Sequence, residues 1–368
     1  MTRAPVMIMA GGTGGHVYPA LAIANALEDR GQPVIWLGTE RGLEARVVVA
    51  ASIPIEWLSV TGLRRKGAAS WLLAPFRLAY ALVQAFMILR RNRPRLVIGM
   101  GGFVSGPGGV AARLSGRPLL IHEQNAVAGL TNRMLARVAT RVMQAFDGAF
   151  PKSLKPVTVG NPVRGDIRDL PKPEQRFEGR EGPLRLLVIG GSQGALALNR
   201  GVPAALATLE APARPTVRHQ AGSGTLEAAQ DAYAVAGVLG EVTPFIEDMA
   251  EALGWADLIV CRAGALTVAE VIHAGVGAIF VPYPAAVDDH QTANAQALVE
   301  AGAALLLSQD SLTAASLAEA MTMLGPDRPA LLERARRARA LRRGDAIDAV
   351  LAQCADVLGE PALAEDAS

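Results

Sequence analysis

Two titratable residues stand at places in the sequence where they could act as a general base. His16 follows a glycine-rich segment, residues 11–15, and Glu123 comes shortly after an apolar run, residues 119–121. A general base removes the proton from a hydroxyl group while that hydroxyl attacks an electrophilic carbon. The N-terminus of a helix favours the neutral, proton-accepting form of an imidazole. His16 could equally bind a phosphate or a backbone group. Glu123 is therefore a second candidate for the base.

Four glycine-rich turns could bind a phosphate. They cover residues 11–15, 99–109, 190–194 and 263–265. Turns of this kind bring backbone N–H groups close to an anion, and a following helix adds a favourable field. The nucleoside-triphosphate loop G-x-x-x-x-G-K-[ST] does not occur, and the dinucleotide pattern G-x-G-x-x-G fails in the first turn because Val17 ends it. A nicotinamide enzyme that binds ribose through Glu40 remains an alternative.

Short apolar runs alternate along the chain with segments of helical period. Residues 6–9, 34–37, 96–98 and 119–121 are typical of buried strands, and residues 19–27 of a helix. The order strand, turn, helix, strand indicates crossover units in a parallel sheet. After a charged, proline-containing segment at 169–182 the pattern starts again, with strands expected at 186–189, 258–260 and 278–281.

Two similar halves predict an α/β fold of two Rossmann-like domains whose parallel sheets face a central cleft. We expect an N-terminal domain at residues 1–163 and a C-terminal domain at 164–344, with a linker at about 160–182. A helix at about 345–358 is expected to pack back on the N-terminal domain, and residues 359–368 to form a frayed tail. Ligands bind beyond the carboxyl ends of parallel strands, so the cleft is the expected site.

Composition excludes several classes of protein. The 368 residues are 51% hydrophobic and 19% charged, unlike a disordered or collagen-like chain. Cys261 and Cys354 are the only cysteines, which excludes a disulfide framework and a four-thiolate zinc site and suits a reducing compartment. We expect no secretory signal, because the glycine-rich segment at residues 11–15 interrupts the first apolar run.

We expect no metal cofactor. The Asp-x-Asp motif, with which one branch of nucleotide-sugar transferases holds a metal on the diphosphate, does not occur. Asp288, Asp289 and His290 could in principle bind a metal, but a polar loop explains them better. Without a metal, a departing diphosphate needs helix N-termini, backbone N–H groups and a cation.

Basic residues are concentrated in one part of the chain. Between Trp57 and His122 there is no Asp or Glu, although the stretch holds many arginines. Apolar residues around these arginines favour an anionic membrane surface over nucleic acid. The apolar stretch at 68–89 contains Pro75 and Arg77, so we expect an amphipathic surface helix or a core helix and not a membrane span.

Six motifs resemble one family along nearly the whole chain, from about Val6 to beyond Gln291. In the first half these are residues 11–16 (GGTGGH), 99–109 (GMGGFVSGPGG) and 122–125 (HEQN). In the second half they are residues 160–164 (GNPVR), 190–195 (GGSQGA) and 264–270 (GALTVAE). The chain therefore resembles the bacterial family-28 glycosyltransferases that add N-acetylglucosamine to the lipid-linked peptidoglycan precursor, with a B-type fold.

The resemblance implies a donor, UDP-N-acetylglucosamine, bound mostly by the C-terminal domain. Glu270 would accept hydrogen bonds from the ribose, Arg164 and Ser192 would hold the phosphates, and Phe245 and Ile246 would contact the uracil. His290 and Gln291 would contact the sugar, and Asn125 either the sugar or the acceptor. Further donor contacts are expected at Gly12, Thr13, Gly14, Gly15, Arg262, Gly264, Ala265, Leu266 and Thr267.

The acceptor implied by the resemblance is undecaprenyl-diphospho-N-acetylmuramoyl-pentapeptide, called lipid I, whose C4 hydroxyl would attack with inversion. Acceptor contacts are expected at Gly101, Gly102, Phe103, Ser105 and Gly106. Where other members carry Tyr, Phe103 offers no hydroxyl, so its role would be apolar. Docking to an anionic inner membrane on its cytoplasmic face is expected through Trp71, Leu72, Phe76, Tyr80, Arg64, Arg65 and Lys66.

The resemblance implies a role in cell-wall biogenesis, and with it in cell shape and cell division. A cell-wall synthesis complex is a possible partner under this expectation. Nucleic acid is not an expected partner. Two alternatives stay open: a related UDP-sugar transferase acting on another lipid, and a non-catalytic module that binds nucleotide sugars or lipids.

Overall fold

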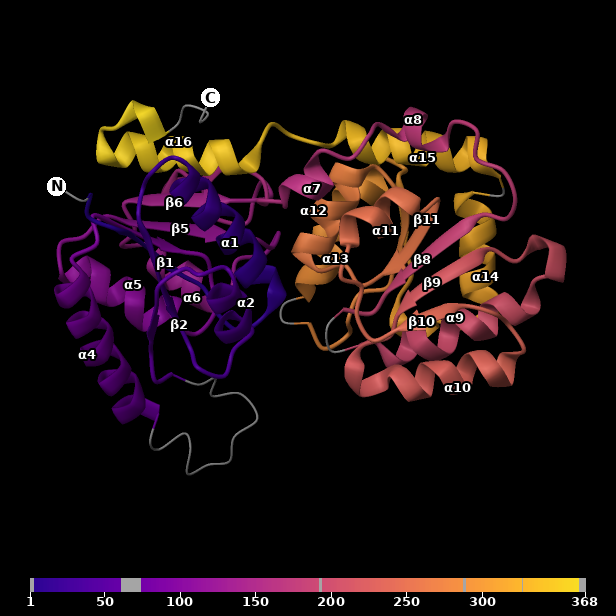
Figure 1. The fold of residues 1–368 in the computed structure, drawn as a ribbon, viewed down its shortest axis with the longest axis horizontal. Helices are drawn as coiled ribbons and strands as arrows, with labels where there is room; N and C mark the ends of the chain where they lie inside the picture. Colours follow the sequence, from indigo (N-terminus) through magenta and orange to yellow (C-terminus); the bar gives the residue numbers. More distant parts are fainter. Residues whose placement is uncertain (1–2, 61–73, 192–193, 287–288, 326, 364–368) are drawn as a thin grey trace. The chain divides into compact units, whose positions relative to one another are not determined.

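The computed structural model describes residues 3–60, 74–191, 194–286, 289–325 and 327–363. The chain divides into two compact units (Figure 1). The first consists of Met1–Val163 with Arg343–Ser368, and the second of Arg164–Arg342. Each unit contains a parallel sheet between helices.

The sheet of the first unit has seven strands in the described part of the chain, in the order β3-β2-β1-β4-β5-β6-β7. All of its pairings are parallel. The central strands are continuous apolar runs, as sheets covered on both faces require. The strands are β1 (Val6–Met9), β2 (Val34–Gly38), β3 (Ile55–Trp57), β4 (Leu96–Gly99), β5 (Leu119–Glu123), β6 (Arg141–Gln144) and β7 (Val157–Thr158).

Helices cover both faces of this sheet because successive strand residues point to opposite faces. Val6 and Ile8 of β1 belong to one core, with apolar residues of α1 and α16. Met7 and Met9 belong to the other, with residues of α4, α5 and α6. The helices of this unit are α1 (Gly14–Asp29), α2 (Glu44–Ala50), α4 (Ala74–Asn92), α5 (Ser105–Leu114), α6 (Leu130–Leu135) and α16 (Ala346–Leu358).

Helix α1 begins five residues before the predicted start at Pro19. Thr13 is extended, with φ −106° and ψ 158°, and forms the N-cap. Its carbonyl accepts hydrogen bonds from the N–H groups of His16 and Val17, at 3.1 Å each, so the first turn closes ahead of the proline. Pro19 therefore lies inside the helix, and His16 belongs to its first turn.

The second unit has a six-stranded parallel sheet in the described residues, in the order β10-β9-β8-β11-β12-β13. The direction in which successive strands are added to the sheet reverses between β8 and β11, as it does between β1 and β4 in the first unit. Both units therefore have the doubly wound arrangement. Its strands are β8 (Arg185–Ile189), β9 (Thr216–Gln220), β10 (Glu241–Thr243), β11 (Leu258–Cys261), β12 (Gly277–Phe280) and β13 (Ala304–Leu306).

Apolar residues of α9, α10, α14 and α15 form a core against one face of the second sheet. In Figure 1, α11, α12 and α13 lie on the other side of β8 and β11. The helices of this unit are α7 (Gly165–Arg168), α8 (Pro173–Phe177), α9 (Leu196–Thr208), α10 (Leu226–Ala236), α11 (Met249–Trp255), α12 (Ala265–Ala274), α13 (His290–Glu300), α14 (Ala314–Leu324) and α15 (Arg328–Ala340).

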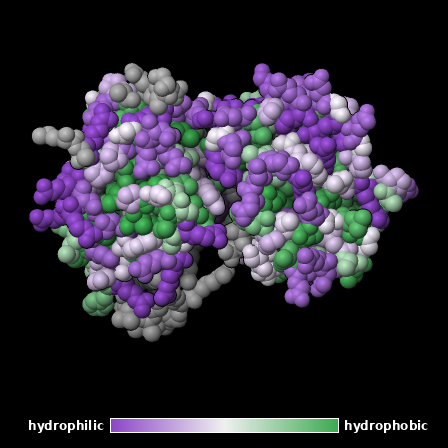
Figure 2. Space-filling view, viewed as in Figure 1, coloured by the Kyte–Doolittle hydropathy of each residue, from purple (hydrophilic) through white to green (hydrophobic). Residues whose placement is uncertain are grey.

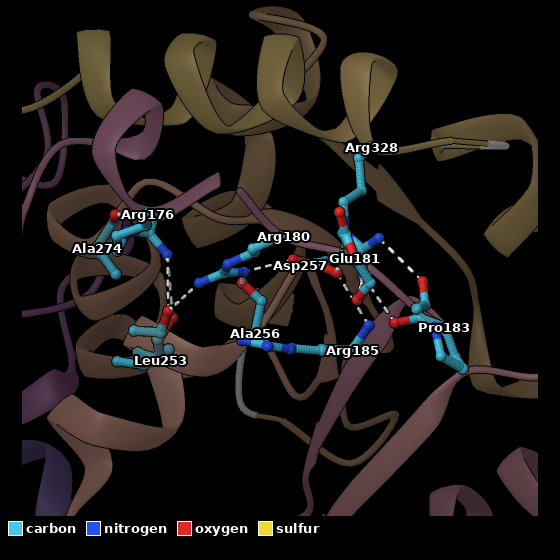
Figure 3. A network of polar contacts seen from close by, with 12 residues as sticks. Arg176, Arg180, Glu181, Pro183, Arg185, Leu253, Ala256, Asp257, Ala274 and Arg328 are labelled. Atoms are coloured by element: carbon cyan, nitrogen blue, oxygen red, sulfur yellow. Dashed lines mark hydrogen bonds and ion pairs between the residues drawn. The ribbon is translucent and has the colours of Figure 1, made fainter. Parts of the chain in front are cut away.

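Residues 169–182, interpreted from the sequence as a linker, are attached to the second unit by a buried polar network (Figure 3). Arg176 donates to the carbonyl oxygens of Leu253 and Ala274, at 3.3 and 2.8 Å. The carboxylate of Asp257 is fully buried and pairs with Arg180 and Arg328. Arg176 caps carbonyl groups at the C-terminal ends of α11 and α12, and Asp257 pairs with a second arginine of the segment, so the segment is part of the domain and not a free connection.

The C-terminal end of the chain belongs to the first unit. Helix α16 lies beside α1 (Figure 1), and its residues Leu351 and Cys354 are buried in the first core. The expected frayed tail is partly ordered, because Arg95 pairs with Glu360 and a 3-10 turn at Pro361–Leu363 buries Leu363.

Candidate active site

A buried carboxylate holds the first glycine turn in the first unit. Glu44 begins α2, and its Oε2 accepts a hydrogen bond from the Gly12 N–H at 2.9 Å. Its Oε1 accepts from the backbone N–H and the hydroxyl of Thr39, at 2.9 and 2.7 Å. Gly12 has a φ of +94°, a backbone conformation that residues other than glycine rarely adopt. Glu44 therefore determines how the turn that precedes α1 is oriented.

His16 lies against the second glycine turn. A Cβ on Gly101 would come within 2.5 Å of the His16 Nδ1, and Gly101 itself has a φ of +102°. Only glycine allows the imidazole to approach the backbone this closely. On its other side, the His16 Nδ1 lies 3.0 Å from the side-chain oxygen of Gln124, which follows β5. His16 is half-buried at the carboxyl edge of the first sheet.

Glu123, the competing candidate for the base, is buried and organises the loop after β5. Its Oε1 accepts from the backbone N–H and the side-chain amide of Asn125, at 3.0 Å each. Its Oε2 accepts from the Gly129 N–H at 3.1 Å and from the Asn132 amide at 2.9 Å. With four hydrogen bonds to one carboxylate, the geometry of Glu123 suits a structural anion better than a proton acceptor.

The expected acceptor contacts divide into exposed and buried groups. Ser105 is buried, and its hydroxyl bonds with the carbonyls of Gly101 and Met9, at 2.8 and 3.2 Å, so it closes the turn. Gly102 has a φ of +84°, and a Cβ there would collide with the backbone of Gly11. The side chain of Phe103 is 53% exposed. Gly106 lies in the first turn of α5.

In the second unit, the two residues expected to bind the donor phosphates and ribose lie next to each other. The Arg164 Nη2 is 4.0 Å from the Glu270 Oε1, and the Arg164 Nε is 3.9 Å from the Asp166 Oδ1. The Glu270 side chain is 13% exposed. Burial raises the pKa of Glu270 to about 7, the charge of Arg164 lowers it, and Asp166 raises it.

Helix α12 begins directly beyond the end of β11. Gly264 is its extended N-cap, and Ala265, Leu266 and Thr267 form its first turn. The first N–H groups of a helix have no acceptor within the helix and favour an anion. Asn294 of α13 is buried and donates to the Ala263 carbonyl at 3.1 Å, which fixes this turn. Thr267 and Glu270 lie one helical turn apart, as the sequence predicts.

The other expected donor contacts lie in segments that follow strands β10, β11 and β12 of the second sheet. The Arg262 guanidinium donates to the carbonyls of Val281 and Pro282 and to the Gln309 side chain, so it supports the strand ends. The Gln291 side-chain oxygen accepts from the Tyr283 N–H at 2.9 Å. His290 begins α13 after the left-handed residue Asp289. Phe245 is exposed and Ile246 half-buried, between β10 and α11.

Several expected residues lie outside the described residues: Ser192, Asp288, Arg64, Arg65, Lys66, Trp71 and Leu72. Of the expected docking residues, Phe76 and Tyr80 are in α4 and are 75% and 62% exposed. The same helix buries Ala81, Ala85, Ile88 and Leu89 against the unit. In Figure 2 hydrophobic residues, in green, appear along the edge where Figure 1 draws α4.

Two features are absent from the described residues. No helix within them is long and apolar enough to cross a membrane. No group of three or more His, Cys, Asp or Glu side chains among them is arranged to hold a metal ion.

Sequence reasoning missed three polar residues that hold the site: Glu44, Gln124 and Asn294. Each accepts from or donates to the backbone of a glycine-rich turn or its neighbour. Gln124 lies between Glu123 and Asn125, and Asn294 lies three residues after Gln291, but the partners of Gln124 and Asn294 are distant in sequence. A buried polar side chain after a strand or within an apolar helix is the signal that could have found them.

Two doubly wound sheets with glycine-rich turns beyond their strand ends are the architecture of the two-domain, B-type glycosyltransferases, and the family matches agree with this class. Residues 6–144 match the glycosyltransferase family 28 N-terminal domain, and residues 185–350 match the glycosyltransferase family 28 C-terminal domain. The chain belongs to glycosyltransferase family 28.

Three comparisons define the relationship further. A protein of Alkalilimnicola ehrlichii is 59% identical over 95% of this chain and 98% of its own, and one of Marinobacter nauticus is 54% identical over 96% and 98%. Both are named UDP-N-acetylglucosamine–N-acetylmuramyl-(pentapeptide) pyrophosphoryl-undecaprenol N-acetylglucosamine transferase. The crystal structure of Acinetobacter baumannii MurG is 44% identical, covers 97% of this chain and 99% of its own, and superposes with a TM-score of 0.81.

Proposed function

We infer that this chain transfers N-acetylglucosamine from UDP-N-acetylglucosamine to N-acetylmuramyl-(pentapeptide) pyrophosphoryl-undecaprenol, converting lipid I to lipid II in peptidoglycan synthesis. The observation that carries this inference is identity of 59% and 54% to transferases of that name over at least 95% of the chain. The predicted fold class and family agree with the structure and with these relatives.

We propose that the second unit binds the donor. Two observations support this proposal: Arg164 pairs with Glu270, and the first turn of α12 lies beyond the end of β11. The ionised carboxylate of Glu270 accepts from the ribose hydroxyls, and Arg164 neutralises the diphosphate. The N–H groups of the first turn of α12 stabilise charge on the leaving UDP, so no divalent cation is needed.

We propose that His16 is the base that deprotonates the C4 hydroxyl of the acceptor. It is half-buried at the strand edge, whereas both oxygens of Glu123 accept hydrogen bonds from the loop that follows β5. The oxygen freed of its proton attacks C1 of N-acetylglucosamine as the bond from C1 to the UDP oxygen breaks. A single displacement of this kind inverts the anomeric centre.

We propose that the enzyme works at the cytoplasmic face of the inner membrane as a peripheral protein. Exposed Phe76 and Tyr80 of α4 provide apolar contact, and Arg77 of the same helix provides positive charge. An apolar face bordered by cations binds at the interface of an anionic bilayer.

The experiment that tests this function follows UDP release with the purified chain, UDP-N-acetylglucosamine and a short-chain lipid I analogue. UDP and a disaccharide product should appear only when both substrates are present, and EDTA should leave the rate unchanged. Transfer of another sugar, or to another lipid, would favour a related transferase. Donor binding without UDP release would favour a non-catalytic module, and binding of NAD in place of UDP would favour a nicotinamide enzyme.

A further inference from the structure

A chain of polar contacts in the first unit runs from a backbone carbonyl to His16. The His122 Nε2 lies 2.9 Å from the Gly160 carbonyl oxygen, and the His122 Nδ1 lies 3.2 Å from the Gln124 Nε2. The Gln124 Nε2 donates to the Met100 carbonyl at 2.8 Å. The Gln124 Oε1 lies 3.0 Å from the His16 Nδ1. His122 and Gln124 are buried.

Each contact assigns a proton, starting from the groups that can only accept. A carbonyl oxygen has no proton, so the His122 Nε2 must donate to Gly160. Burial lowers the pKa of His122 to about 4, and the hydrogen bond to the Gly160 carbonyl, the nearby Glu123 and His16 change it less. A neutral ring with a proton on Nε2 has a lone pair on Nδ1, which accepts from Gln124.

The orientation of the Gln124 amide follows from two independent acceptors. The Met100 carbonyl and the His122 Nδ1 both require the nitrogen of the amide on their side. The amide oxygen must therefore face His16, and it too can only accept. The carboxylate of Glu123, which precedes Gln124 in the chain, does not compete for His16 in this arrangement, because both its oxygens accept from Asn125, Gly129 and Asn132.

We propose that Gln124, oriented by Met100 and His122, is a positioning residue that holds the proton of His16 on Nδ1 and leaves Nε2 as the nitrogen that takes the acceptor proton. This rests on the proposed role of His16 as base. An imidazole with one nitrogen protonated accepts a proton only at the other nitrogen, so the tautomer decides which edge of the ring can react.

The direct test is a spectroscopic measurement of the His16 tautomer. The full chain is labelled with ¹⁵N at histidine, and the two-bond ¹H–¹⁵N spectrum is recorded at pH 8, with His16 assigned by comparison with His16→Gln. We expect the form with the proton on Nδ1, and loss of this preference in Gln124→Met. A predominant Nε2–H form in the unmodified chain would overturn the proposal.

This measurement needs neither donor nor acceptor. If the Nδ1–H form is found but no sugar is transferred, the proposed function fails and the positioning role of Gln124 stands. If sugar is transferred but the Nε2–H form is found, the proposed function stands and the positioning role of Gln124 fails.

A kinetic test separates positioning from simple structural support. Gln124→Met should lower kcat about 10- to 100-fold and leave KM for UDP-N-acetylglucosamine within about twofold, because base assistance is lost and not binding. Gln124→Glu keeps an acceptor beside Nδ1 and adds a negative charge, which stabilises the imidazolium, although its second oxygen cannot donate to the Met100 carbonyl or to His122, which should lower Tm. It should retain more activity than Gln124→Met and move the acidic limb of the kcat–pH profile to higher pH.

Gln32→Met is the matched control. Gln32 is also a buried amide of the first unit, and it donates to the carbonyls of Ala4 and Pro33, at 2.9 and 3.1 Å. Its loss should lower Tm without moving the pH profile or the His16 tautomer. An unmoved acidic limb in Gln124→Glu, or equal kcat losses in Gln124→Met and Gln32→Met, would count against the positioning role.

Discussion

The guanidinium of Arg164 and the carboxylate of Glu270 approach to 4.0 Å within the second unit. Arg164 is the N-cap of the short helix α7, and Glu270 lies in the second turn of α12, so the packing of α7 on α12 brings them together. Two residues that the sequence assigns to different parts of the donor therefore form one pair, and we expect the ionisation of Glu270 to affect donor binding.

Donor binding should weaken as pH falls through the pKa of Glu270. Burial raises this pKa to about 7, so the carboxyl group becomes protonated in mildly acidic solution and loses its capacity to accept two ribose hydrogen bonds. We expect KM for UDP-N-acetylglucosamine to rise up to about tenfold per pH unit below 7. Steady-state kinetics between pH 5.5 and 8.5 measure it. Glu270→Gln should bind the donor more weakly, with a KM that does not change with pH. A KM that does not change with pH in the unmodified enzyme would contradict the prediction.

Glu270 should also reduce the stability of the free enzyme at neutral pH. Its folded pKa, about 7, is above the ordinary value of 4.5, so protonated Glu270 favours the folded state, and this contribution is lost as pH rises from 4.5 through 7. The loss is about 3 kcal/mol at most. Glu270→Gln should therefore have a higher Tm than the unmodified chain at pH 8, and the difference should shrink toward pH 5. A lower Tm for Glu270→Gln at pH 8 would show that pairing with Arg164 outweighs burial.

The two candidates for the base should respond differently to neutral replacement. His16→Gln should lower kcat about 10²- to 10⁴-fold with little change in Tm, since a half-buried base is lost. Glu123→Gln should mainly lower Tm, because an amide nitrogen would face the N–H donors that the carboxylate now satisfies. Kinetics and thermal unfolding of both variants decide between them. Near-normal turnover in His16→Gln would remove His16 as the base.

The buried network around Asp257 should be a major source of stability in the second unit. Asp257→Asn leaves the guanidinium groups of Arg180 and Arg328 without their carboxylate partner, at a cost of about 3 kcal/mol or more. Thermal unfolding should show the loss. Glu174→Gln removes an exposed pair with Arg336 in the same unit and should change the stability by less than about 1 kcal/mol. Equal effects of the two substitutions would contradict this account.

Membrane docking through α4 should depend on both apolar contact and lipid charge. The double substitution Phe76→Ser with Tyr80→Ser removes two exposed apolar side chains and should weaken binding to anionic phosphatidylglycerol vesicles at least about tenfold. Vesicle co-sedimentation measures it, with UDP release from a water-soluble acceptor as the control for folding. Val235→Ser, an exposed apolar residue of the second unit, should leave binding unchanged. Unaltered binding of the α4 variant would contradict docking through this helix.

Much of the fold follows from local patterns. The apolar runs at Val6–Met9, Val34–Gly38 and Arg185–Ile189 are strands because both of their faces are buried, and such runs are recognisable without knowledge of their neighbours. The glycine turns follow the same strands as expected. Residues 169–182 were harder, because charge and proline suggest a linker whereas Arg176 and Arg180 find carbonyl and carboxylate partners more than 70 residues away.

By itself the sequence determined the class of protein: two repeats of strand, glycine turn and helix, with family motifs that name the chemistry and its candidate residues. Only the tertiary structure decided what each candidate side chain contacts. Glu123 accepts hydrogen bonds from its own loop, Ser105 closes a turn, and Gln124 faces His16 across 108 positions of sequence. Hydrogen bonds depend on distances of about 3 Å between atoms that parallel pairing brings together, and such distances are not encoded in spacing along the chain.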